Sequence, residues 1–98
     1  MTINKTANGS ALTIELIGRL DTTTAPELEA VVTGELDGVE NLIFDIKELE
    51  YVSSAGLRVF LAAQKKMNKQ GSMKLINVND VIMDVFDITG FSDILTIE

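Results

Sequence analysis

The sequence predicts an α/β domain built on one mixed, mostly parallel β-sheet of four to five strands with three to four helices. The first observation behind this prediction is that short apolar runs alternate with amphipathic segments of helix length. Strands that alternate with helices form right-handed crossovers and parallel pairs. The second observation is size, because 98 residues with 46% hydrophobic and 23% charged side chains suit one modest core. We therefore expect residues 1–98 to form a single domain.

The chain is expected to begin with a hairpin. Residues 11–20 (ALTIELIGRL) alternate apolar and polar side chains, as a half-buried strand does. Asn8 and Gly9 form a favourable turn dipeptide, so residues 3–6 are expected to pair with that strand as a short antiparallel edge.

The first helix is expected to start in the segment TAPE, residues 24–27. Thr24 stands at the N-cap, a proline lies in the first turn, and Glu27 occupies the third helical position, which is a capping-box pattern. The helix is predicted to reach about Leu36 and to end at Asp37-Gly38.

The second half of the chain is expected to alternate strand and helix twice more. Residues 41–46 (NLIFDI) are mostly apolar and suit a central strand that is covered on both faces. The remaining predicted elements are a helix from Ser53-Ser54 to about Gln70-Gly71, a strand at 74–78, a helix from Asn79 or Asp80 to about Thr89, and a last strand or frayed tail at 94–97.

The composition excludes several classes of enzyme. Without cysteine or histidine, the chain cannot build nucleophile–histidine pairs or the common zinc sites. No run of acidic residues has the spacing of a calcium-binding loop. We therefore expect no catalytic residue and no metal site.

Charge and hydropathy limit the partners. A net charge of −7 works against binding of nucleic acid, which needs a concentration of lysine and arginine. No apolar run approaches the ~20 residues that span a bilayer, and the first ten residues lack the layout of a secretory signal. We expect no nucleic-acid binding, no membrane insertion and a cytoplasmic location.

Four of the eight basic residues gather in one predicted helix, at Arg58, Lys65, Lys66 and Lys69. At helical spacing, Arg58, Lys65 and Lys69 share one side, with Lys66 at its margin. This side is either a solvated polar face or a docking surface for an acidic or phosphate-bearing partner. Arg58 is the most informative of the four because it lies one turn from Ser54.

Two predicted strand-to-helix junctions carry more polar residues than a turn needs. They are residues 18–24 (GRLDTTT) and 51–56 (YVSSAG). Both are expected at the same edge of the sheet, where the functional groups of open α/β sheets gather.

The two serines of the second junction have different expected roles. If Ser53 is the N-cap, its hydroxyl accepts a hydrogen bond from the N–H of Ala55 or Gly56, and the hydroxyl of Ser54 stays free. Gly56 would let another surface approach the first turn closely. A phosphate on Ser54 would meet free N–H groups and the positive end of the helix dipole. The residues alone leave two interpretations, a plain cap or a phosphoacceptor.

Three segments together resemble a known family. GRLD (18–21), LIFDI (42–46) and YVSSAGLRVFLAA (51–63) look like a STAS domain, and most of all like the bacterial anti-sigma factor antagonists, also called anti-anti-sigma factors. The resemblance covers nearly the whole chain in order and length. It implies a STAS-like fold and a serine or threonine at this helix start that a partner kinase phosphorylates.

The resemblance also implies the partners and the site. The kinase would be a GHKL-type serine kinase that doubles as the anti-sigma factor, and a PP2C-type phosphatase would reverse the reaction. When the motif of the family is aligned on Ala55-Gly56-Leu57, its phosphoacceptor falls on Ser54. Ser53, where the family often has an acid, is the second choice. The implied partner surface consists of Asp21, Thr22, Thr23, Ser53, Ser54, Ala55, Gly56 and Arg58. The kinase would bring ATP and magnesium, so the chain needs no cofactor.

Two other functions stay open from the sequence. STAS domains also occur as soluble subunits of membrane transporters, including phospholipid ABC complexes, in which they contact the ATPase. A sensor of a small anion at the 53–56 helix end is a further alternative, although no second basic group lies near it in sequence.

Overall fold

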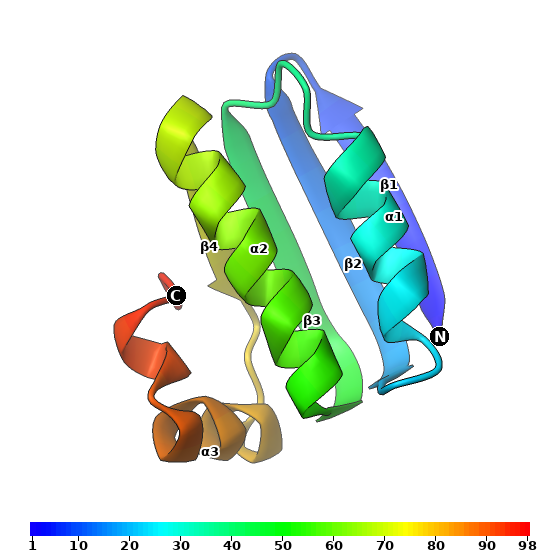
Figure 1. The fold of residues 1–98 in the computed structure, drawn as a ribbon, viewed down its shortest axis with the longest axis vertical. Coiled ribbons are helices and arrows are strands. Elements are labelled where there is room, and N and C mark those ends of the chain that lie inside the picture. Colours follow the sequence, from blue (N-terminus) through cyan, green and yellow to red (C-terminus); the bar gives the residue numbers. More distant parts are fainter.

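The four strands form one mixed sheet in the order β1-β2-β3-β4, as a computed structural model of residues 1–98 shows (Figure 1). Strand β1 is antiparallel to β2, whereas β2, β3 and β4 are parallel. The elements are β1 (Thr2–Asn8), β2 (Ala11–Leu20), α1 (Ala25–Gly34), β3 (Asn41–Val52), α2 (Ser54–Gln70), β4 (Ser72–Ile76), α3 (Asp80–Thr89) and the short 3-10 helix η1 (Phe91–Asp93). The predicted fold class is confirmed.

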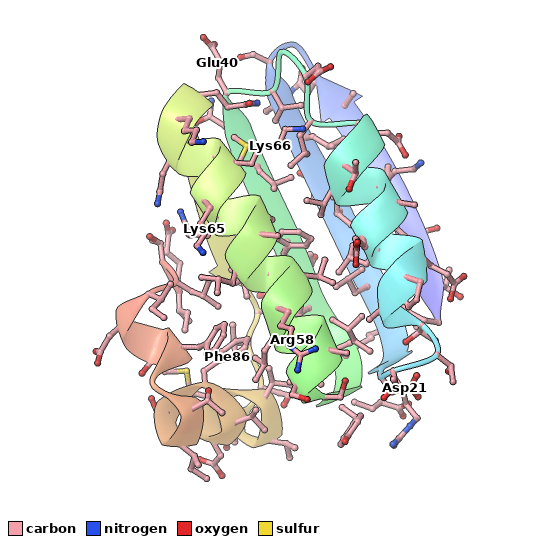
Figure 2. All side chains as sticks on the ribbon, viewed as in Figure 1. Asp21, Glu40, Arg58, Lys65, Lys66 and Phe86 are labelled. Carbon is pink, nitrogen blue, oxygen red and sulfur yellow. The ribbon has the colours of Figure 1, made fainter.

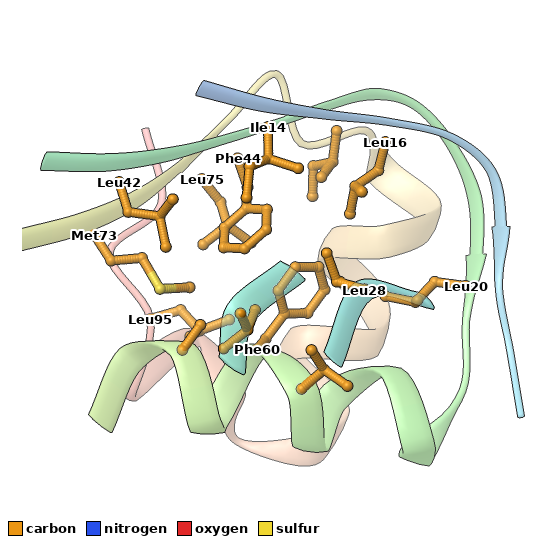
Figure 3. Packing of buried hydrophobic residues seen from close by; sticks show 14 of the residues in the cluster. Ile14, Leu16, Leu20, Leu28, Leu42, Phe44, Phe60, Met73, Leu75 and Leu95 are labelled. Carbon is orange, nitrogen blue, oxygen red and sulfur yellow. The ribbon is translucent and has the colours of Figure 1, made fainter. Parts of the chain in front are cut away.

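The core lies between the sheet and the helices. Helices α1 and α2 run side by side across one face of the sheet (Figure 1). Phe44 of β3 meets Phe60 of α2 with ring centroids 5.2 Å apart, and Phe60 meets Phe86 of α3 at 6.1 Å, both edge-on. Figure 3 shows Phe44 and Phe60 among aliphatic side chains that come from β2, β3, β4 and α1. This aromatic series connects α3 to the same core as α2.

The expectation that β3 is covered on both faces was wrong. Leu42, Phe44 and Ile46 are buried, but Ile43 and Asp45 between them are only half-buried. The reason is that α1 and α2 pack on the same face, so alternate side chains of β3 point away from both helices. The run NLIFDI is thus a strand with one buried face.

Strand β3 is twelve residues long, about twice the predicted length. Only its first part, Asn41–Asp45, pairs with β4. Beyond that point α3 packs beside β3, and the side-chain amide of Asn79 donates to the carbonyl oxygen of Leu49 at 2.9 Å. Strand β4 begins two residues earlier than expected and ends before Asn77, which has a left-handed backbone (φ 57°).

The helix starts at residues 54 and 80 agree with the predictions. Asn79 caps α3, because its side-chain oxygen accepts from the N–H of Ile82 at 3.0 Å. Helix α1 ends at Gly34, two residues before the expected end. The C-terminal segment forms one isolated parallel bridge, between Leu75 and Ile97, rather than a full strand.

Candidate functional site

Strands β2 and β3 end side by side, which brings the two polar junctions together as predicted. Leu20 pairs with Val52 in the parallel register, and the N–H of Ser53 donates to the carbonyl oxygen of Leu20 at 2.9 Å. The segments that follow both strands therefore leave from one edge of the sheet. Figure 2 shows Asp21 and Arg58 at this end of the molecule.

Ser53 is the N-cap of α2 in the structure. Its backbone is extended, and its hydroxyl oxygen accepts from the N–H of Gly56 at a long 3.4 Å. Its carbonyl oxygen accepts from the N–H of Leu57 at 2.9 Å. Ser54 is the first helical residue and is exposed. The first N–H groups of a helix have no partner within it, so those of Ser54 and Ala55 remain available to an anion on the Ser54 hydroxyl.

Asp21 organises the turn that precedes α1. Its Oδ1 accepts from the hydroxyl of Thr23 at 2.7 Å and from the N–H groups of Thr23 at 2.9 Å and Thr24 at 3.1 Å. These hydrogen bonds, that of the Thr23 hydroxyl above all, hold the pKa of the Asp21 carboxyl below its usual value. Thr22 and Thr23 are exposed at the same turn.

The predicted capping box at residues 24–27 was wrong. The Thr24 hydroxyl makes no capping hydrogen bond to α1. It donates instead to the carbonyl oxygen of Arg19 and accepts from the N–H of Asp21, both at 2.8 Å. The Asp21 carboxylate satisfies the N–H of Thr24, so the acid that the family resemblance singled out also shapes the turn.

Removing the charge of Asp21 should change how stability depends on pH. The folded-state pKa is lowered, so the ionised carboxyl stabilises the folded domain above about pH 4, and this contribution is lost as the pH falls through the folded-state pKa. Asp21→Asn keeps an acceptor oxygen without the charge. The wild type should melt slightly higher than Asp21→Asn at pH 7, and the gap should narrow below about pH 4. Thermal melts between about pH 7 and pH 3 test this, and a gap independent of pH would contradict it.

Gly56 does not open the helix start to a partner, which corrects the expectation from the sequence. The residue is buried, and a Cβ atom at this position would lie 2.6 Å from Cγ of Leu20 and 3.0 Å from Cγ2 of Val52. The absent side chain thus allows α2 to pack closely on the ends of β2 and β3. The reason for glycine here is internal packing.

The basic residues of α2 do not act as one group. Arg58, Lys65 and Lys69 are exposed, whereas Lys66 is half-buried and its Nζ lies 3.5 Å from the carbonyl oxygen of Thr33 in α1. Its Nζ lies 3.9 Å from a carboxylate oxygen of Asp37. Arg58 is the member nearest to Ser54 along the helix, one turn after it.

Two residues of this edge were not predicted as site residues, Arg19 and Tyr51. Arg19 of β2 pairs with Tyr51 of β3, and its guanidinium carbon lies 4.3 Å from the centroid of the tyrosine ring. Arg19 Nε also lies 3.9 Å from Oδ2 of Asp21. Arg19 therefore places a cation beside the Asp21 turn, although it is 35 residues from Ser54 in sequence and already has two partners.

This edge is a surface rather than a cavity. The fold forms two surface hollows, and neither includes a residue of the segments 18–24 or 51–58. No acidic residues gather in a group that could hold a metal ion. Elsewhere in the chain, no helix is both long and apolar enough to cross a membrane. The geometry suits recognition of another macromolecule more than binding of a small ligand.

Comparison with known proteins gives consistent matches. The family model described as STAS domain matches residues 2–98. The chain is 33% identical over 91 residues to the anti-sigma-B factor antagonist of Bacillus subtilis, an alignment that covers 92% of this chain and 84% of that protein.

Two solved structures show how widely this fold is used. The phosphorylated form of the Bacillus cell fate determinant SpoIIAA matches with a TM-score of 0.78 and 18% identity, over 99% of this chain and 91% of that one. A sulfate transporter family protein from Wolinella succinogenes matches with a TM-score of 0.79 and 18% identity, over 93% of this chain and 75% of that one. At these identities the likeness concerns the fold alone.

Proposed function

The chain belongs to the STAS domain family, and from this premise we propose that it is an anti-sigma factor antagonist whose partner binding is controlled by phosphorylation of Ser54. In its unphosphorylated form it binds an anti-sigma serine kinase through the Ser54 edge and thereby releases a sigma factor. Phosphorylation by the bound kinase weakens the complex, and a PP2C-type phosphatase restores the binding form. The chain itself is a binding module of the cytoplasm and catalyses no reaction.

The exposed Ser54 hydroxyl at the first position of α2 is the observation that carries this proposal. Ser53 takes the capping role, so Ser54 can be modified without loss of the cap. A phosphate there would lie near free N–H groups and the positive helix end, which favour its charge in the free protein. The unfavourable effect of the phosphate must then appear in the complex, where the phosphate meets a kinase surface that holds nucleotide phosphates.

A transporter-subunit function has the same fold but less support. The Wolinella succinogenes protein is similar to this chain in fold, at 18% identity. The Bacillus subtilis antagonist is similar in sequence, at 33% identity over 92% of this chain. The two functions predict different partners.

Equilibrium binding distinguishes them. The purified chain is titrated by calorimetry with a GHKL-type anti-sigma kinase from the same organism and a non-hydrolysable ATP analogue, and the complex is then exposed to ATP and magnesium. The proposal predicts a saturable complex that disappears as phosphate accumulates on the chain. Lack of any complex, together with binding to the ATPase of a neighbouring transporter, would favour the transporter function.

Arg58→Glu should weaken the kinase complex. The substitution places an acid one turn after Ser54 and reverses the local charge, so both the affinity and its dependence on salt should fall. Arg58 is exposed, and an exposed substitution typically changes stability by about 0.5 kcal/mol or less. The same titration at low and high salt measures the effect.

Lys69→Glu is the matched control for Arg58→Glu. It makes an equivalent change of charge on the same helix, about 16 Å further along at 1.5 Å per residue, and Lys69 is also exposed. Equal losses in both variants would indicate a general effect of net charge and would remove Arg58 from the interface.

A further inference from the structure

Helix α3 exposes a stripe of apolar side chains, formed by Val81, Val85 and Ile88. Their spacing of four and three residues places them on one side of the helix. The side chain of Val81 is 63% exposed and that of Ile88 is 85% exposed, while Val85 is half-buried. Val81 and Ile88 are two of the four large hydrophobic residues that the chain exposes.

The stripe is not the side of α3 that the core uses. Ile82 and Phe86 form that side and are fully buried, with the Phe86 ring packed edge-on against Phe60. Helix α3 therefore has one apolar side for the fold and, beside it, a stripe in which Val85 packs partly against the core while Val81 and Ile88 stay exposed. An isoleucine with 85% exposure contributes almost nothing to the core.

A row of acids borders the stripe. Asp80, Asp84 and Asp87 repeat with the same four-and-three spacing, adjacent to the stripe on the helix surface, and all three are exposed. Helix α3 has no basic residue. Two copies of α3 packed through their stripes would bring two such rows together within a dimer of chains that each carry −7. Charge therefore disfavours a second copy of this chain as the occupant.

The stripe lies at the same end of the molecule as Ser54. Figure 1 shows α3 at the end of the sheet where α2 begins. The hydrogen bond from Asn79 to Leu49 fixes the start of α3 against β3, three residues before Val52. One partner protein can therefore cover both surfaces at once.

We propose that the α3 stripe is a second contact of the anti-sigma kinase, filling an apolar groove that is bordered by lysine or arginine side chains. The inference rests on the proposed function and deepens it. The apolar stripe supplies affinity that does not depend on phosphorylation, and the acidic row sets the orientation of the bound kinase. Phosphorylation of Ser54 controls whether the complex forms. The complex then has an apolar anchor at α3 and a charge-sensitive contact at the start of α2.

The test uses the full chain, the same kinase with magnesium and a non-hydrolysable ATP analogue, and the variant Ile88→Glu. Because Ile88 is exposed, folding should stay intact, which a measurement of the thermal midpoint checks, and the affinity should fall about tenfold or more. Ala30→Glu adds the same charge at an exposed position of α1 and should bind as the wild type does. The double variant Asp84→Asn, Asp87→Asn should associate more slowly and with a weaker dependence on salt.

Each contrary result has a distinct meaning. If the wild type binds the kinase and Ile88→Glu binds equally well, the stripe is not an interface and only this inference is wrong. If the wild type does not bind the kinase, the proposed function and this inference are both wrong. If the wild type sediments as a dimer and Ile88→Glu as a monomer, the occupant is a second copy, which also overturns the inference.

Discussion

Ser54→Asp should lower the affinity of the chain for its anti-sigma kinase at least about tenfold, which corresponds to about 1.4 kcal/mol. The introduced carboxylate lies at the contact with a kinase surface that holds nucleotide phosphates, and like charges at an interface are strongly unfavourable. Ser54→Ala should bind at least as tightly as the wild type and should accept no phosphate. Calorimetric titration with the kinase and a non-hydrolysable ATP analogue measures both affinities.

Ser53→Ala is the matched control for this pair. Loss of an N-cap hydroxyl costs about 1 kcal/mol, and the hydrogen bond here is long at 3.4 Å, so a loss in the lower part of the usual range is expected. The variant should still bind the kinase and should still be phosphorylated. Weak binding by Ser54→Ala, or normal binding by Ser54→Asp, would contradict the assignment.

The free protein should tolerate a phosphate on Ser54. A phosphoserine adds about −1.5 to −2 charges at pH 7, and the first turn of a helix favours negative charge. The thermal midpoint of the phosphorylated chain should therefore hold or rise slightly. A large fall would mean that the phosphate disrupts the fold rather than the complex.

Gly56→Leu should destabilise the domain by at least about 2 kcal/mol, because it forces a side chain into a packed core. Even the first side-chain atom, Cβ, would lie 2.6 Å from Cγ of Leu20 and 2.8 Å from Cδ2 of Leu20. The better helix propensity of leucine offsets no more than about 1 kcal/mol. Urea denaturation should show a lower midpoint with a similar slope.

Gly34→Ala tests whether this effect comes from packing. Gly34 ends α1, is exposed, and an added Cβ would meet nothing within 4 Å. Alanine there should be neutral or should stabilise by up to about 1 kcal/mol, chiefly by restricting the unfolded chain. If Gly56→Leu is as stable as the wild type, the core around Leu20 and Val52 must be able to adjust.

Local signals in the sequence predicted most of the fold. The helix starts at Ser53-Ser54 and at Asn79-Asp80 were correct because a capping side chain acts within three residues of itself. The same rule failed at Thr24, where Asp21 and the end of β2 compete for the hydroxyl. The Asp21 turn is also local, but the carbonyl oxygen of Arg19 at the end of β2 holds the Thr24 hydroxyl, and the capping-box pattern does not include this contact.

Features that depend on how distant segments pack could not be predicted. The role of Gly56 in α2 depends on Leu20, which lies at the end of β2. The contact of Arg19 with Tyr51 depends on a shift of the β2–β3 register between Gly18 and Arg19. Strand β3 has one covered face because α1 and α2 pack on the same side of the sheet (Figure 1).

The most direct test of the account is to map phosphate by mass spectrometry after the chain is incubated with its kinase, ATP and magnesium. The account predicts one phosphate, on Ser54, in the wild type and in Ser53→Ala, and none in Ser54→Ala. Phosphate on Ser53 alone would reverse the roles of the two serines. Phosphate on neither, from a kinase that is active on a control substrate, would contradict the proposed function.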